Sequence, residues 1–221
     1  MYYDAIYNKK LDAFENNSMS KFLNDSAKFF YANLMNGDVI SPSKLKEVWD
    51  RKCRKYPDYI TPQKCLDGLN LLMKLYNWAK KVELIVLGMS TPYRLLFKDD
   101  KIIVGYSGEI EVVAMQKKGK PEILITDFSS RVPDLNLLDT KLKYTLDSFG
   151  YLETAKEKVG VHIHHVNTDK DFFTFRNAND LQRCNTTIKN VAYCINQNLF
   201  YPRENFYCTG CGIKYFCKGW H

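Results

Sequence analysis

The chain lacks the features that would place it in a membrane or mark it for secretion. No stretch approaches the about 18 apolar residues that cross a bilayer, and the opening segment MYYDAIYNKKLDAFENN is polar where a signal peptide is apolar. An even set of cysteines is also missing. There are seven, which without a secretory signal favours thiols that are free or metal-bound in a reducing compartment. We therefore expect no membrane contact and a cytoplasmic location, in the host cytoplasm if the source is viral.

Internal repeats, low-complexity tracts and blocks of like charge are absent too, and the composition excludes a further class. Hydrophobic residues make up 45% of the 221 positions, enough to bury a core, which argues against intrinsic disorder. The net charge of +7 has two interpretations: ordinary solubility, or a polyanionic partner that a basic protein attracts. The Lys, Asn and Tyr usage fits an origin in a phage or another mobile element.

The first 80 residues read as helical. Apolar residues at helical spacing predict three helices, over 19–35, 41–53 and 62–81. Asn36-Gly37 ends the first helix, and Ser41 and Thr61 are the N-cap candidates for the second and third.

The pattern then changes to β-rich runs. Residues 82–128 predict an antiparallel meander of three or four strands, with turns at Asp99-Asp100 and Lys118-Gly119 and a central strand in ILITDF. The remaining predicted elements are a helix over 137–158, strands over 159–166 and 171–176, and a helix over 178–197. We predict one α/β fold, a mixed central sheet flanked by helices, with residues 1–80 as a helical layer packed on a core of residues 81–221.

Two carboxylates stand in predicted strands, Glu111 in GEIEVV and Asp127 at the end of ILITDF. A short hairpin joins these strands, so the two side chains are expected side by side. Neighbouring carboxylates repel and stay ionised together when a cation lies between them. Oxygen ligands suit Mg²⁺ or Mn²⁺, which can activate water and neutralise charge on a phosphate. The alternative is that Glu111 faces solvent and Asp127 begins a turn.

The order of the motifs resembles a known superfamily. After the helices come GEIE (Gly108–Glu111) and TDFSS, a helix ending near Tyr151, a strand pair, a helix, and FYP before C-x2-C-x5-C. Over about residues 17–220 this resembles the PD-(D/E)XK nucleases. Within them it resembles the RecB-like branch that includes CRISPR-associated iron–sulfur exonucleases and the AddB nuclease domain.

The resemblance implies a restriction-endonuclease-like fold and Mg²⁺- or Mn²⁺-dependent hydrolysis of DNA. It assigns metal binding to Glu111 and Asp127, and it matches Asp147 and Tyr151 to the Gln-x3-Tyr motif that helps to position DNA. The partners it implies are DNA and a helicase, recombination or replication protein.

Two groups of the family pattern are missing. Ser129 stands where the motif lysine belongs, and no histidine precedes His162, so the usual ligand on the first helix is absent. Three explanations compete. Lys141 or Lys143 supplies the cation from the following helix, the site is degenerate and the fold serves as a DNA-binding or protein-assembly scaffold, or the chain is active only beside a partner.

Three cysteines and a histidine crowd the end of the chain: Cys208, Cys211, Cys217 and His221. In the branch that this chain resembles, the three cysteines hold a [4Fe–4S] cluster, whose fourth thiolate lies before the first helix. No cysteine precedes Cys53 here, so Cys53 and Cys65 are possible substitutes. The alternatives are a structural Cys3His zinc site that includes His221, which would also suit a purely structural zinc-binding subunit, or no metal.

Two smaller patterns have open interpretations. Lys117, Lys118 and Lys120 crowd a predicted hairpin tip, either as a solvated loop or as a grip on a nucleic-acid backbone. In HIHH, His162 and His164 share one strand face, either as a metal site or as a polar edge that faces solvent.

Overall fold

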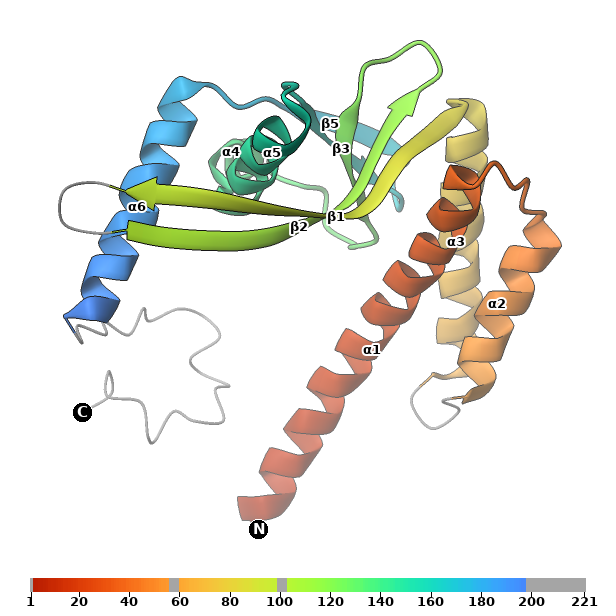
Figure 1. Ribbon diagram of the computed structural model, residues 1–221. Helices are drawn as coiled ribbons and strands as arrows, with labels where there is room; N and C mark the ends of the chain where they lie inside the picture. Colours follow the sequence, from red (N-terminus) through yellow and green to blue (C-terminus); the bar gives the residue numbers. More distant parts are fainter. Residues whose placement is uncertain (1, 56–59, 99–102, 198–221) are drawn as a thin grey trace.

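The sheet is the centre of the fold. The computed structural model describes residues 2–55, 60–98 and 103–197, and in the first helix the side chains from Met19 onward (Figure 1). Five strands follow the order β1-β2-β3-β4-β5: β1 Leu84–Lys98, β2 Ile103–Gln116, β3 Glu122–Asp127, β4 Gly160–His165 and β5 Lys170–Thr174. Only the β3–β4 ladder is parallel. The predicted mixed α/β sheet, with ILITDF in its central strand, is confirmed.

Three helices precede the sheet: α1 Tyr2–Met35, α2 Pro42–Lys55 and α3 Pro62–Lys81. The end of α1 and the starts of α2 and α3 are the predicted ones, whereas α1 begins at Tyr2, well before the predicted residue 19. Gly37 follows α1 with a positive φ of 78°, and the hydroxyls of Ser41 and Thr61 accept hydrogen bonds from the backbone N–H groups of Lys44 and Lys64. None of the described helices is long and apolar enough to cross a membrane.

The other helices are α4 Leu135–Thr140, α5 Leu142–Ala155 and α6 Ala178–Asn196. The prediction of a single helix over 137–158 is wrong, because Lys141 takes an extended conformation (φ −64°, ψ 115°) between α4 and α5. The predicted helix over 178–197 is confirmed and begins with a capping box of Asn177 and Asp180.

Helices cover both faces of the sheet (Figure 1). One core cluster joins α1–α3 to the sheet and includes Phe30, Trp49 and Leu124. The second cluster joins α4–α6 to the sheet and includes Leu146 and Ile163. Side chains on β2 and β3 contribute to both clusters, which leaves these central strands between two helical layers.

Candidate functional site

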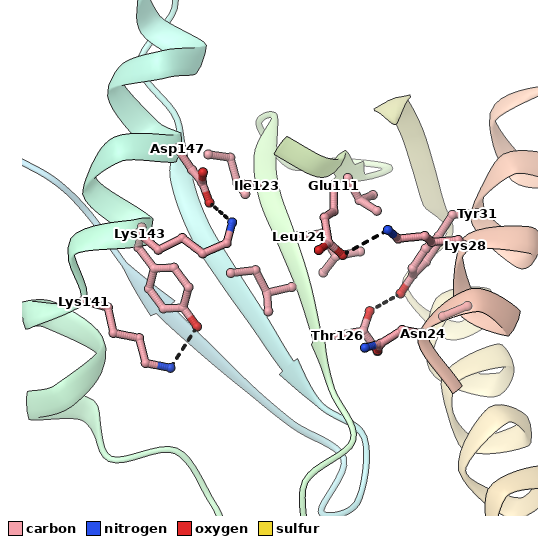
Figure 2. A pocket seen from close by; sticks show the side chains of 14 residues that line it. Asn24, Lys28, Tyr31, Glu111, Ile123, Leu124, Thr126, Lys141, Lys143 and Asp147 are labelled. Carbon is pink, nitrogen blue, oxygen red and sulfur yellow. Dashed lines mark hydrogen bonds and ion pairs between the residues drawn. The ribbon is translucent and has the colours of Figure 1, made fainter. Parts of the chain in front are cut away.

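A pocket of about 410 Å³ opens where β2 and β3 separate (Figure 2). The ladder between these two strands consists of the pairs Val113↔Ile123 and Ala114↔Glu122. Beyond these pairs, α1 forms one wall of the pocket and α5 forms the other. Glu111 of β2 and residues 123–126 of β3 lie between the two walls.

The α1 wall is a single stripe of the helix. Asn24, Ala27, Lys28 and Tyr31 line the pocket, and their spacing of three and four residues puts them on one helix face. The Tyr31 hydroxyl lies 2.5 Å from Thr126 Oγ1 on β3. Burial raises the pKa of Tyr31 above its ordinary value, so the phenol is neutral and this bond fixes α1 against the strand.

The α5 wall carries Asp147, whose side chain is almost fully buried. Its carboxylate accepts hydrogen bonds from the Tyr93 hydroxyl at 2.8 Å and from Lys143 Nζ at 2.7 Å. Lys141 Nζ donates to the Tyr144 hydroxyl at 3.3 Å and lies 5.0 Å from the centre of that ring. Lys143 of α5 and Lys141, just before it, therefore each have a partner on α5.

Glu111 faces α1 across the pocket. Its Oε2 lies 3.8 Å from Lys28 Nζ, and the two side chains are 59% and 42% exposed, respectively. Together with Asp147, Lys141 and Lys143 they give the lining three ammonium groups and two carboxylates. The excess of one positive charge makes the pocket suited to an anion such as a phosphate.

Asp127 and Ser129 are not among the residues that line this pocket. Asp127 ends β3, and its Oδ1 accepts a hydrogen bond of 2.8 Å from the Ser129 backbone N–H. The Ser129 hydroxyl donates to the carbonyl of Arg131 at 2.9 Å. His165 Nε2 donates to the Ser129 carbonyl at 2.9 Å. Ser129 thus serves the turn after β3, and the sharing of one ion by Glu111 and Asp127 stays a prediction.

The DNA-contacting candidates lie apart from the pocket. Tyr151 is half-buried and packs against the second core cluster, where burial and then the charge of Glu157 raise its pKa. Lys117 forms an ion pair with Glu83, and Lys117 and Lys118 border a different hollow at the β2–β3 turn. Lys120 follows that turn on the surface. A role of these residues in binding DNA stays a prediction.

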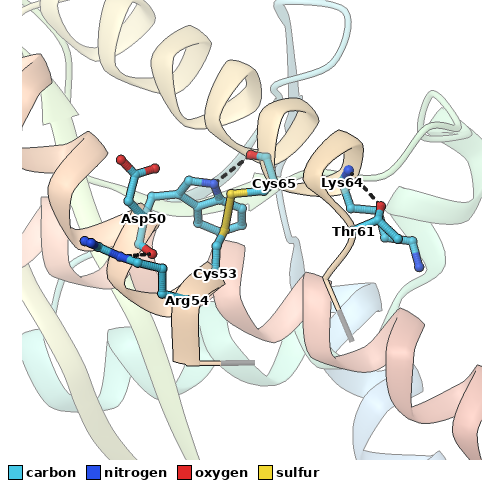
Figure 3. Close-up of a disulfide and its surroundings, with 7 residues drawn as sticks. Asp50, Cys53, Arg54, Thr61, Lys64 and Cys65 are labelled. Atoms are coloured by element: carbon cyan, nitrogen blue, oxygen red, sulfur yellow. Dashed lines mark hydrogen bonds between the residues drawn. A yellow bond between two sulfur atoms is a disulfide. The ribbon is translucent and has the colours of Figure 1, made fainter. Parts of the chain in front are cut away.

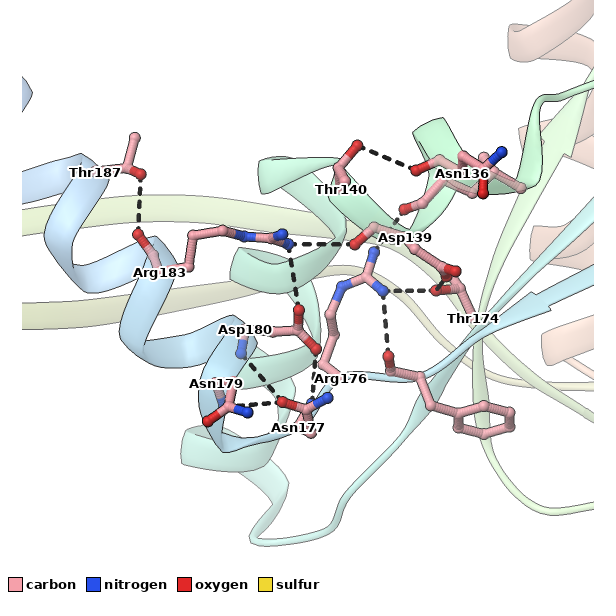
Figure 4. Close-up of polar contacts among 12 residues, drawn as sticks. Asn136, Asp139, Thr140, Thr174, Arg176, Asn177, Asn179, Asp180, Arg183 and Thr187 are labelled. Carbon is pink, nitrogen blue, oxygen red and sulfur yellow. Dashed lines mark hydrogen bonds and ion pairs between the residues drawn. The ribbon is translucent and has the colours of Figure 1, made fainter.

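Distant residues hold the end of α4, just before Lys141 (Figure 4). Arg176, after β5, donates to the Leu138 carbonyl at 2.8 Å and to Thr174 Oγ1 at 2.6 Å. Arg183 of α6 donates to the Asp139 carbonyl at 3.3 Å. These contacts set where α5 starts and therefore where Lys141 and Lys143 enter the pocket.

The histidine run of β4 is buried. His162, His164 and His165 are at most 2% exposed, so the interpretation of HIHH as a solvent-facing edge is wrong. The shared face of His162 and His164 is confirmed, because both rings lie 2.9 Å from the same oxygen of Asp171. No three His, Cys, Asp or Glu side chains in the described part of the chain form a group that could hold a metal ion.

Two of the cysteines proposed as cluster ligands are bonded to each other. Cys53 of α2 and Cys65 of α3 form a disulfide (Figure 3), so the expectation of free or metal-bound thiols is wrong for this pair. Beside it, Trp49 Nε1 donates to the Cys65 carbonyl at 2.7 Å. The four proposed ligands at the C-terminus lie outside the described residues, and their metal stays a prediction: Cys208, Cys211, Cys217 and His221.

Reduction of the disulfide is expected to lower the free energy of unfolding by about 2–3 kcal/mol. The bond closes a loop across a sequence separation of 12, and the entropy of a loop of that size in the unfolded chain gives this magnitude. Urea unfolding with and without dithiothreitol measures the difference. The Cys53→Ser/Cys65→Ser variant should no longer respond to the reductant, whereas Cys194→Ser should respond like the wild type. Equal unfolding midpoints for the oxidised and reduced wild type would contradict the prediction.

Sequence reasoning missed the α1 side of the pocket. Asn24 and Lys28 are polar positions on a helix that the sequence predicts from its apolar residues alone. The available signal is their spacing of four residues, followed three residues later by the buried Tyr31. This spacing indicates that Asn24 and Lys28 lie next to the buried face of α1.

Comparisons with known proteins add little. No protein-family model matches the chain, and no curated protein matches it significantly. One solved structure that is similar is the crystal structure of SSO0001, with a TM-score of 0.40 and 13% sequence identity over 92% of this chain and 95% of that chain. A similarity of this size carries no argument about function.

Proposed function

We propose that the chain is a metal-dependent nuclease that hydrolyses phosphodiester bonds of DNA in the pocket between α1 and α5. The observation that carries the proposal is the position of Glu111 in a pocket with three lysines and a net positive lining. A carboxylate that can bind a cation, next to ammonium groups that can bind phosphate oxygens, is the combination that phosphodiester hydrolysis requires.

The donor set fits a hard divalent cation. Mg²⁺ keeps several of its waters and needs only one or two protein carboxylates, and the half-exposed Glu111 is open to a hydrated ion. Asp127 is the second candidate ligand. It ends β3, the strand that pairs with β2. When bound, such an ion supplies Lewis-acid chemistry that activates water and neutralises charge on the phosphate.

The protein's own groups have separable tasks in this proposal. Glu111 and Asp127 hold the cation, and Lys141 and Lys143 attract the phosphate backbone at the α5 wall. Asp147, buried between Tyr93 and Lys143, keeps Lys143 in place.

A second function is a catalytically degenerate scaffold that binds DNA or assembles with a protein. The observation in its favour is that both pocket carboxylates already have a lysine partner, Lys28 for Glu111 and Lys143 for Asp147. The uncharged Ser129 at the motif position points the same way.

The two functions are separated by incubating the protein with labelled single- and double-stranded DNA and Mn²⁺. We expect cleavage that Glu111→Gln and Asp127→Asn each reduce by about a hundredfold or more, because metal-ion catalysis is worth several kcal/mol and each 1.4 kcal/mol is a factor of ten. Glu109→Gln, an exposed acid two residues earlier on β2, is the matched control and should cleave like the wild type.

The remaining outcomes are equally informative. Cleavage that survives both substitutions would place the activity elsewhere and overturn the proposal. DNA binding without any cleavage would favour the scaffold.

A further inference from the structure

We infer that Lys28 of α1 supplies the catalytic cation that is missing at Ser129. This inference rests on the proposed nuclease function. Ser129 cannot fill the role, because its hydroxyl donates to Arg131 in the turn after β3 and the residue does not line the pocket. Lys28 lines the pocket, and its Nζ is 3.8 Å from Glu111, the first candidate metal ligand.

The position of Lys28 is fixed by its neighbours on α1. Ala27 is buried against the first core cluster, and Tyr31 is bonded to Thr126 of β3. Lys28 lies one turn before Tyr31 on α1 (Figure 2). The bond that anchors this turn to β3 therefore also fixes the backbone position of Lys28. Its side chain is 42% exposed, which leaves the ammonium group accessible to a phosphate.

The two lysines at the start of α5, Lys141 and Lys143, are weaker candidates for the same role. Lys143 is held 2.7 Å from the buried carboxylate of Asp147, and Lys141 is held by the Tyr144 hydroxyl and ring. Each has its ammonium group engaged by a residue of α5, on the side of the pocket away from Glu111 (Figure 2). Lys28 is the lysine of the pocket lining that contacts Glu111.

In the reaction, Lys28 remains an ammonium group and transfers no proton. The oxygen of a water forms a bond to phosphorus, and one P–O ester bond breaks. The water loses its proton to solvent, and the departing oxygen takes one from solvent. Lys28 hydrogen-bonds a non-bridging phosphate oxygen, whose negative charge grows as the water adds, and so stabilises the transition state more than the bound substrate.

The same geometry has a consequence for metal binding. An ammonium group 3.8 Å from Glu111 repels a divalent cation at that carboxylate, so removing its charge should tighten binding of Mn²⁺. The repulsion between one unit charge and a divalent cation about 4 Å apart in water corresponds to about thirtyfold in affinity. This readout does not depend on cleavage.

The test compares Lys28→Met and Lys28→Arg with Lys21→Met, the matched control. Lys21 is exposed two turns earlier on α1 and does not line the pocket. We expect Lys28→Met to lower single-turnover cleavage of DNA by about ten- to a hundredfold and to bind Mn²⁺ more tightly in a titration without DNA. Lys28→Arg should keep most of the cleavage, and Lys21→Met should match the wild type in both measurements.

The outcomes separate this inference from the function on which it rests. Wild-type cleavage that Lys28→Met leaves unchanged would overturn the role of Lys28 while the nuclease proposal stands. A Mn²⁺ affinity that is the same in Lys28→Met and the wild type would show that the Lys28 charge does not act on a cation at Glu111. That result would also overturn the inference. A wild-type protein that does not cleave DNA would overturn both proposals.

Discussion

Replacing His162 by glutamine is expected to lower the free energy of unfolding by about 3–5 kcal/mol at pH 5.5, the magnitude found when one partner of a buried ion pair is removed. The His162 side chain is 3% exposed and lies between two carboxylates. Its Nδ1 is 3.3 Å from Glu122 on β3, and its Nε2 is 2.9 Å from Asp171 on β5. Because both nitrogens face acceptors, the geometry calls for the doubly protonated imidazolium.

Neighbouring rings enclose this ion pair. Phe173 stacks on His162 with ring centroids 4.4 Å apart, and Trp78 of α3 stacks on His164 at 3.9 Å. The indole N–H of Trp78 donates to Asp171 at 3.3 Å. The same carboxylate therefore binds two histidines and the helical layer, so an unpaired charge here would disturb the contact between α3 and the sheet.

The pH dependence has a definite sign. Burial by itself lowers the pKa of His162, but the hydrogen bonds to Asp171 and Glu122 outweigh it and raise the pKa above its ordinary value of 6.5. A raised pKa in the folded state adds stability that is fully present below pH 6.5 and is lost as the pH rises through the folded pKa. The pKa of Asp171 is below its ordinary value of 3.8. Burial alone would raise this pKa, but the hydrogen bonds and charges of His162 and His164 outweigh burial and lower it. Its carboxylate is charged throughout this range.

Urea unfolding of the wild type and His162→Gln between pH 5 and pH 9.5 measures this contribution. We expect the difference between the two proteins to be largest near pH 5.5 and to shrink at alkaline pH. Asp169→Asn is the control, because Asp169 is exposed and 4.0 Å from the neighbouring His164. A difference that stays constant with pH would mean that His162 is neutral and acts only through packing.

The sequence predicted the elements whose causes are local. The end of α1 at Gly37 and the starts of α2 at Ser41 and α3 at Thr61 follow from cap chemistry that acts over a few residues. Alternation along β4 likewise placed His162 and His164 on one face.

The break at Lys141 has causes that a local pattern does not contain. The last carbonyls of α4, at Leu138 and Asp139, accept hydrogen bonds from Arg176 and Arg183, which lie 38 and 44 residues further along the chain. These donors satisfy carbonyl groups that would otherwise favour continuing the helix. Periodicity alone therefore predicted one helix where the fold has two.

The candidate site could be predicted only in part, because some of its contacts join residues that are far apart in the sequence. Glu111, Lys141 and Lys143 were selected from motif order, and the structure brings them into one pocket. Lys28 is 83 residues before Glu111 in the sequence, and no local pattern relates the two. Their contact depends on how α1 packs on β3, which Tyr31 and Thr126 determine.

Substituting Gly150 by alanine is expected to lower the free energy of unfolding by about 3 kcal/mol, at the upper end of what overpacking a core costs. A Cβ at Gly150 of α5 would lie 2.3 Å from ring atoms of Tyr93. The other end of the ring packs so closely on Gly108 of β2 that a Cβ added there would lie 2.4 Å from it, which leaves the ring little room to move away. The matched control is Gly105→Ala on β2, where an added Cβ meets nothing within 4 Å.

A double-mutant cycle identifies the clash as the cause. Tyr93→Leu removes the ring, so Gly150→Ala should be much less destabilising in the Tyr93→Leu background than in the wild type. The cycle also bears on the pocket, because the Tyr93 hydroxyl donates to Asp147, which in turn holds Lys143. Equal destabilisation by Gly150→Ala in both backgrounds, measured by urea unfolding, would contradict the prediction. The glycine would then be required by helix α5 itself and not by its contact with Tyr93.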